Sequence, residues 1–147
     1  MRMDTLICRV DPKTGQWQSL QIPYAYPELE TSTGLLTVQA MAEDRCIYIA
    51  PRGWVYAECL LPDALLACRA TLPRGRATVQ FIDPVLRESH HMWLNDVEIF
   101  EENGRPIFID PETGYTVAVF AHTTEIFIKH RLGQVEHRIF DTSVSEI

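Results

Sequence analysis

Turn residues recur at short intervals along this chain, between short runs rich in Val, Ile, Thr, Phe and Tyr. Two segments, VDPKTGQW (10–17) and IDPETGYT (109–116), share the pattern D-P-x-T-G. In such a turn the Asp carboxylate accepts backbone N–H groups, Pro fixes φ, and Gly permits the positive φ that closes the loop. Turns this frequent leave room for short strands, so the sequence predicts a mostly β protein.

Two Pro-Arg-Gly segments, at 51–53 and 73–75, suit type I turns closed by a glycine bulge. They predict one hairpin between CIYIA and WVYAEC and another between ACRATL and RATVQF. If these strands form a simple meander, both loops lie at the same end of one sheet.

Two tighter hairpins are predicted further along. Asn103-Gly104 suits a type I′ turn, with Glu102 opposite Arg105. A Gly133-Gln134 turn sets His130 opposite His137, with Ile128 opposite Ile139 and Phe127 opposite Phe140. Together the hairpins predict antiparallel meanders, either closed into a barrel or folded as two packed sheets.

Three other segments complete the expected organisation. A short helix is predicted over residues 84–95, because Asp83 can cap it, Pro84 suits its first turn and Asn95 can end it. PYAYPELETSTG (23–34) is predicted to be a long loop, and the tail 142–147 to be frayed.

Length and charge limit the classes of protein to consider. A chain of 147 residues with 46% hydrophobic residues is most simply one domain, 1–147, with its own core. Its formal net charge of −7 disfavours nucleic acid as a main ligand and favours a basic protein partner. A homo-oligomer is also compatible with the sequence.

Compartment is inferred from what the sequence lacks. The N-terminus has no apolar run or cleavage pattern typical of a secretion signal, and no apolar stretch is long enough to cross a membrane. We therefore expect a cytoplasmic protein without membrane attachment. Its cysteines, Cys8, Cys46, Cys59 and Cys68, have no zinc-site spacing and are interpreted as small buried hydrophobes.

Aromatic and arginine residues in turns are the binding candidates. Tyr24 and Tyr26 lie in the predicted loop, where two prolines would display them at low entropic cost, and Trp54 follows a turn. Arg52, Arg74 and Arg76 would gather on one rim of the predicted meander. With Tyr48 and Tyr56 that rim could receive an anionic small molecule.

Catalytic motifs are absent from the sequence. It contains no GxSxG, Walker, GxGxxG or HExxH pattern, and none of its motifs implies a cofactor. His130 and His137 are weak metal candidates, because a site needs at least one further ligand. His90 and His91 would point about 100° apart on a helix. The carboxylates of Glu28, Glu30, Glu101 and Glu102 are interpreted as solvated.

These features favour a small acidic interaction protein of the inhibitor, immunity or adaptor type, which acts by surface complementarity and not by catalysis. Two alternatives stay open. One is a ligand-binding barrel for an anionic small molecule, and the other is an enzyme or metalloprotein built on the histidines.

Overall fold

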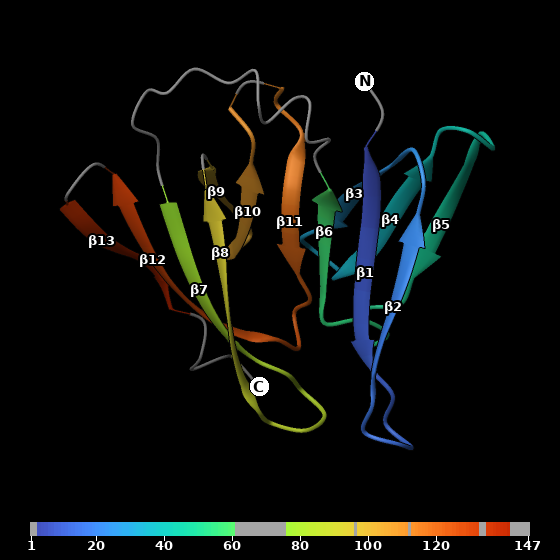
Figure 1. The fold of residues 1–147 in the computed structure, drawn as a ribbon, viewed down its shortest axis with the longest axis horizontal. Helices are drawn as coiled ribbons and strands as arrows, with labels where there is room; N and C mark the ends of the chain where they lie inside the picture. The colour runs from blue at the N-terminus through green and yellow to red at the C-terminus, as the bar shows by residue number, and fades with distance from the viewer. Residues whose placement is uncertain (1–2, 61–75, 96, 112, 133–134, 142–147) are drawn as a thin grey trace.

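The computed structural model describes residues 3–60, 76–95, 97–111, 113–132 and 135–141, with the backbone alone at residue 76 and from residue 130 onward. Within these ranges the chain forms thirteen strands and no helix (Figure 1). Every strand pair in the described part is antiparallel. The predicted class, mostly β with antiparallel meanders, is confirmed.

The strands form three sheets, which we call A, B and C. Sheet A has the order β2-β1-β6-β11-β10-β9 and comprises β1 (Asp4–Val10), β2 (Trp17–Ile22), β6 (Tyr56–Leu60), β9 (Glu98–Glu102), β10 (Arg105–Ile109) and β11 (Thr116–Phe120). Sheet B has the order β3-β4-β5 and comprises β3 (Ala25–Glu30), β4 (Leu35–Ala40) and β5 (Arg45–Ile49). Sheet C has the order β13-β12-β7-β8 and comprises β7 (Arg76–Ile82), β8 (Ser89–Asn95), β12 (Glu125–Leu132) and β13 (Val135–Asp141).

Sheet A is the middle layer, with a hydrophobic core on each face. Val119 of β11 is fully buried toward sheet B, in one core with Ala57 and Leu36. The next residue, Phe120, is fully buried toward sheet C, 5.4 Å from Phe81 between ring centroids. A strand covered on both faces is expected to be continuously apolar, as TVAVF is. Sheet C lies to the left of the central strands and sheet B to the right in Figure 1.

Three loops that open with Asp-Pro have the same backbone geometry. In residues 11–16, 83–88 and 110–115 the Asp N–H donates to the carbonyl of the sixth residue, and the N–H of the fifth residue donates to the Asp carbonyl, at 2.8–3.2 Å. The fifth residue has positive φ in each loop: Gly15 (71°), Arg87 (62°) and Gly114 (75°). The two D-P-x-T-G turns are thus confirmed, and the third loop repeats them without glycine.

The predicted helix over 84–95 is wrong. Residues 83–88 are the third Asp-Pro loop, and Ser89–Asn95 form β8, paired with β7. Asp followed by Pro suits the start of a helix as well as this loop. The pairing of β8 with β7 requires the loop, in which the chain turns back at Arg87 with a positive φ of 62°. His90 and His91 consequently lie on opposite faces of a strand and not on a helix.

Two further predictions are corrected. The predicted hairpin at 51–53 does not form, because β5 pairs with β4 in sheet B while β6 pairs with β1 and β11 in sheet A. Burial of Trp54, 1% exposed between the two sheets, accounts for this crossing between layers. The predicted loop 23–34 contains β3, an edge strand, where Pro27 is tolerated.

The Asn103-Gly104 hairpin is confirmed. Asn103 and Gly104 both have positive φ, and Glu102 lies opposite Arg105 as predicted. The register of β12 with β13 sets His130 opposite His137 as predicted, although residues 133–134 of that turn are outside the described part. The predicted pairs Ile128–Ile139 and Phe127–Phe140 are wrong, because a bulge after Ile128 sets Ile128 opposite Phe140 and Phe127 opposite Asp141. The Pro-Arg-Gly turn at 73–75 and the tail 142–147 lie outside the described residues.

Candidate functional site

The residues predicted to form an anion-binding rim are not brought together. Trp54 is a core residue, Tyr48 lies on the exposed side of β5, and Tyr56 faces the core between sheets A and C. Arg52 is exposed in the β5–β6 connection. Arg74 lies outside the described residues, and the side chain of Arg76 is not described either.

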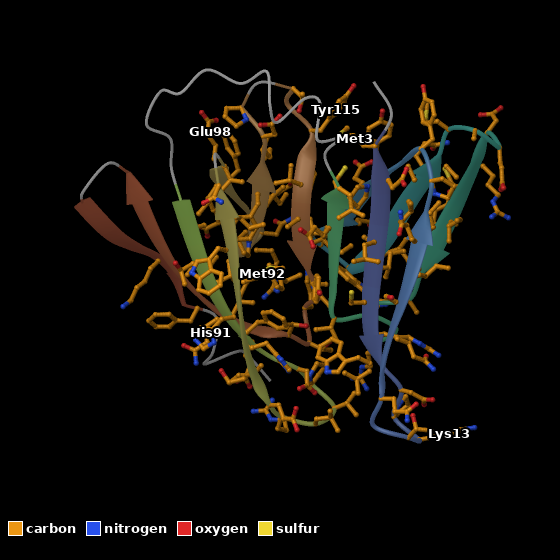
Figure 2. The ribbon with its side chains drawn as sticks, viewed as in Figure 1. Met3, Lys13, His91, Met92, Glu98 and Tyr115 are labelled. Carbon is orange, nitrogen blue, oxygen red and sulfur yellow. The ribbon has the colours of Figure 1, made fainter. Side chains whose placement is uncertain are left out.

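Tyr24 and Tyr26, the other predicted binding residues, belong to a cluster of three tyrosines. The ring centroids of Tyr24 and Tyr26 lie 6.5 Å apart, and those of Tyr26 and Tyr115 lie 4.9 Å apart. Burial, followed by the neighbouring Tyr115 and Tyr24, raises the pKa of the Tyr26 phenol. Tyr115 comes from the third Asp-Pro loop in chain order, at the top of the view in Figure 2. The cluster therefore joins sheet B to sheet A.

An acidic groove of about 470 Å³ lies between β3 of sheet B and the β9–β11 part of sheet A. Among the described residues its lining comes from both sheets and includes no Lys, Arg or His: Glu28, Leu29, Glu30, Thr31, Ser32, Thr37, Glu102, Asn103, Ile107, Ile109, Thr116 and Val119. Asn103 Nδ2 donates to Thr31 Oγ1 at 3.0 Å, which fixes the β9–β10 turn against the β3–β4 turn.

The groove has an apolar floor and an acidic rim. Val119 and Leu29 are buried at 0% and 6% exposure, while the carboxylates of Glu28, Glu30 and Glu102 are exposed. This arrangement matches a Lys or Arg side chain, whose methylene stem covers apolar surface while its charged head stays polar.

The tyrosine cluster and the groove are continuous along β3. Tyr26, Glu28 and Glu30 alternate with buried residues, so they share the outer face of the strand, about 6.7 Å apart from one to the next. Across sheet B, Glu28 pairs with Thr37, and Thr37 pairs with Tyr48, which is 65% exposed. We call Tyr26, Tyr48, Tyr115, Glu28, Glu30 and Glu102 the tyrosine–glutamate surface.

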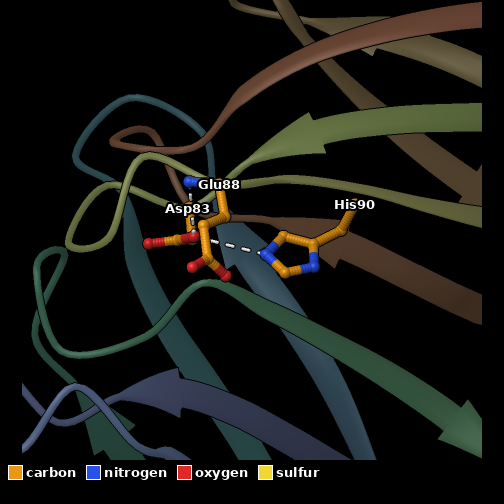
Figure 3. A group of neighbouring side chains, drawn as sticks. All are labelled: Asp83, Glu88 and His90. Carbon is orange, nitrogen blue, oxygen red and sulfur yellow. Dashed lines mark hydrogen bonds and ion pairs between the residues drawn. The ribbon is translucent and has the colours of Figure 1, made fainter.

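A second polar cluster surrounds Asp83 in the β7–β8 loop (Figure 3). Its Oδ1 accepts the N–H groups of Val85, Leu86 and Arg87, and its Oδ2 accepts the Glu88 N–H at 3.1 Å and lies 3.2 Å from His90 Nε2. Burial alone raises the pKa of a carboxyl group, but these hydrogen bonds outweigh it and lower the pKa of Asp83.

His90 connects this cluster to two sheets. Its ring stacks on Phe81 of β7 at 5.2 Å between centroids and meets the edge of Trp17 of β2 at 5.0 Å. The neighbouring His91 lies on the other side of β8, the outer side of sheet C (Figure 2). The sequence-based expectation that His90 and His91 do not act as a pair is thus consistent with the alternation of the strand.

Asp83, Glu88 and His90 offer three ligand atoms within 4.8 Å of one another. A cation there would have to compete with four backbone N–H groups for the oxygens of Asp83, which is fully buried. The hydrogen bonds instead satisfy the backbone N–H groups of a tight loop, which is the ordinary role of Asp in such a turn. We therefore assign the cluster to loop stabilisation. His130 and His137 lie opposite each other in the backbone ladder, and their side chains are not described.

The two buried cysteines of the described chain are not activated nucleophiles. Cys8 and Cys59 are buried, and burial raises the pKa of the Cys8 thiol and brings that of Cys59 to about 12. Both thiols therefore stay protonated and inert at neutral pH. Cys46 is exposed, which corrects the expectation that it is buried, and Cys68 lies outside the described residues.

No protein-family model, curated protein or solved structure matches this chain. Within the described residues no helix is long and apolar enough to span a membrane.

The sequence predicted part of the tyrosine–glutamate surface. Tyr26 was predicted as a binding residue beside Tyr24, and Tyr48 was predicted on the anion-binding rim. Glu28, Glu30 and Glu102 were interpreted as solvated, and Tyr115 was not predicted. A signal for Tyr115 was present, since it follows a D-P-x-T-G turn in a hairpin loop. Nothing in the local sequence connects that loop to β3.

Proposed function

We propose that this protein is a small interaction module that binds a basic segment of another protein on the tyrosine–glutamate surface. It acts by surface complementarity, as an inhibitor, immunity or adaptor protein does, without catalysis. The observation that carries the proposal is the groove of about 470 Å³, where the described lining residues combine an apolar floor, three carboxylates and no basic side chain.

Chemistry and charge support a Lys- or Arg-rich segment. The tyrosines beside the groove can stack on a guanidinium or ammonium group, and Tyr is favoured where one surface recognises another. The net charge of −7 attracts a basic partner from a distance and accelerates association at low salt.

The test measures binding of a fluorescein-labelled Arg-rich peptide by anisotropy, over a series of salt concentrations, with a Gln-substituted peptide as the neutral probe. We expect the triple variant Glu28→Gln/Glu30→Gln/Glu102→Gln to bind about tenfold more weakly, because exposed ion pairs contribute about 0.2–1 kcal/mol each.

A matched variant, Glu43→Gln/Asp44→Asn/Glu101→Gln, removes the same formal charge outside the groove. Glu43 pairs with Arg45 at 2.7 Å, and Glu101 points to the opposite face of β9 from Glu102. Its affinity should stay within about threefold of the wild type, since distant exposed charges are screened. An equal loss of affinity in both variants would mean that peptide binding depends on net charge alone, and the proposed site would be wrong.

A further inference from the structure

Within the described part of the chain, β2 is an edge of sheet A, and it lacks the features that normally protect such edges. Its sequence, WQSLQI, contains no charged residue and no proline, and five of its six residues are exposed. Its ladder with β1 runs through six residue pairs without a register shift. Proteins usually protect exposed edges with charges, proline or a bulge, because an open edge is a template for another strand.

Four of the other five described sheet edges carry protection that β2 lacks. Charged residues or proline occur on β9 (Glu98, Glu101, Glu102), β3 (Pro27, Glu28, Glu30), β5 (Arg45) and β13 (Glu136, Arg138, Asp141). The fifth edge, β8, also lacks Asp, Glu, Lys and Arg, but only four of its seven residues are exposed, against five of six in β2. β2 is therefore the edge best prepared for pairing.

Charge at this edge is balanced, although the chain carries −7 overall. The charged neighbours on β1 are each held by a glutamine of β2: Arg9 Nε donates to Gln18 Oε1 at 2.7 Å, and Gln21 Nε2 donates to Asp4 Oδ2 at 2.9 Å. One positive and one negative group leave no net charge beside the strand. Two copies of an acidic chain can meet here without like-charge repulsion.

The backbone of β2 directs hydrogen-bonding groups to the open side. The carbonyl of Cys8 accepts from the Val55 N–H at 2.8 Å and so points away from β2. Ser19, opposite Cys8, is consequently at a position that is not hydrogen-bonded to β1. By the alternation of an antiparallel ladder, Trp17, Ser19 and Gln21 present their N–H and C=O groups outward.

We infer that two copies of this chain associate through β2, antiparallel, about a two-fold axis at Ser19. In this register Ser19 faces Ser19 of the second copy, and Trp17 faces its Gln21. A two-fold axis perpendicular to the sheet puts the same face of sheet A on the same side in both copies. Paired residues must therefore point to the same face, so their numbers differ by an even number, as they do here. About six main-chain hydrogen bonds would form, and sheet A would continue across the dimer.

A groove next to β2 can receive side chains of the second copy. It has a volume of about 610 Å³ and is lined by Ile7, Leu20 and Ile49 among others. Leu20 is 54% exposed in a single copy. In the proposed register, Leu20 of the second copy lies opposite Gln18 and above this groove. Main-chain bonds at an edge with pockets for alternate side chains are the usual mode of strand addition.

The first test is sedimentation equilibrium of the full chain over a range of concentrations. We expect a monomer–dimer equilibrium for the wild type and a monomer for Ser19→Pro and Leu20→Lys at the same concentrations. Ser19→Pro should keep its fold, because proline is tolerated where the N–H faces outward from an edge strand. Met41→Lys changes a residue that is 48% exposed in the β4–β5 turn, and it should dimerise as the wild type does.

The second test reads the register by disulfide cross-linking, in a Cys46→Ser background that removes the exposed thiol. Ser19→Cys should form a disulfide-linked dimer on mild oxidation, because directly opposed residues have Cα atoms about 5.5 Å apart. Gln18→Cys should not form this dimer. Residue 18 of the second copy lies two residues along the ladder, so the two Cα atoms are farther apart than the distance of about 7 Å that a disulfide can span.

Three outcomes would overturn the proposal. These are a wild-type chain that stays monomeric at the highest concentration, dimerisation that survives Ser19→Pro with the fold intact by circular dichroism, and loss of the dimer on Trp93→Lys, which would assign the interface to β8. None of these variants replaces a residue of the tyrosine–glutamate surface, so this proposal and the proposed function are tested separately.

Discussion

At the scale of single residues, one aspartate decides the geometry of each Asp-Pro loop. Asp11, Asp83 and Asp110 each accept local backbone N–H groups through a carboxylate oxygen. In the β7–β8 loop Arg87 adopts a φ of 62°, where the other two loops have glycine. The Arg87 guanidinium also pairs with Glu125 of β12 at 3.1 Å. This ion pair accounts for an arginine at a position that favours glycine.

Asp83→Asn should lower the free energy of unfolding by about 1–3 kcal/mol, because one oxygen that accepts hydrogen bonds in a buried site becomes a donor. Asp11→Asn is the control, and it should cost less than about 1 kcal/mol, since that loop is exposed. Urea unfolding at neutral pH measures both values. Equal losses would contradict the role assigned to burial.

The same carboxylate predicts a pH dependence. The pKa of Asp83 is lower in the folded chain than the ordinary value of 3.8, so the unfolded chain binds its proton more readily. The stabilisation is therefore complete above that ordinary value and is lost as pH falls through the lower folded value. Asp83→Asn should flatten the acid limb of the stability curve, and parallel curves for the two proteins would contradict this account.

At the scale of elements, two buried threonines tie strands of different sheets together. Thr5 of β1 donates to the Ala25 carbonyl of β3 at 2.8 Å, which joins sheet A to sheet B. Thr124, just before β12 of sheet C, donates at 2.9 Å to the carbonyl of Val55, just before β6 of sheet A. Both threonine side chains are almost fully buried, so water cannot take the place of either hydroxyl as the donor.

Thr5→Val should destabilise the protein by about 1–2 kcal/mol, since the buried Ala25 carbonyl loses this donor. Thr124→Val should cost about 0.5–1 kcal/mol, since the Val55 carbonyl still accepts the Ala121 N–H at 2.9 Å. The double variant should show the sum, because the two contacts share no partner. Thr78→Val, on the outer face of sheet C, is the control and should change stability by no more than about 0.5 kcal/mol. Chemical denaturation measures all four proteins, and a strongly sub-additive double variant would contradict independent contacts.

At the scale of the whole molecule, sheet A is shared by two hydrophobic cores. Leu36 belongs to the core with sheet B and Phe120 to the core with sheet C, and both are fully buried. Because the same strands line both cores, neither outer sheet can lose its packing without exposing one face of sheet A. We expect the layers to unfold together.

Leu36→Ala and Phe120→Ala should therefore each lower a single unfolding transition, by about 2–5 and 3–5 kcal/mol respectively. Far-ultraviolet circular dichroism and tryptophan fluorescence followed over the same denaturant series check this, because coincident curves indicate one cooperative unit. Two separate transitions in either variant would show that an outer sheet unfolds on its own.

The sequence by itself determined the features that depend on a few neighbouring residues. The D-P-x-T-G loops, the Asn103-Gly104 turn and the pairing of His130 with His137 follow from local turn chemistry, because the interacting groups are close along the chain. The same local rules predicted a helix at 84–95, because the start of a helix and an Asp-Pro loop use the same first two residues.

Only the tertiary structure decided how the hairpins were distributed among three sheets and which side chains met between them. Trp54 is buried in the core between sheets A and B, where the chain crosses from sheet B to sheet A. Tyr115 packs against Tyr26, and Glu102 lines the same groove as Glu28, although these residues are far apart in the sequence. No local pattern encodes these contacts. They arise because each sheet must bury its apolar face against another, and the edge strand β3 then lies beside the β9–β11 part of sheet A.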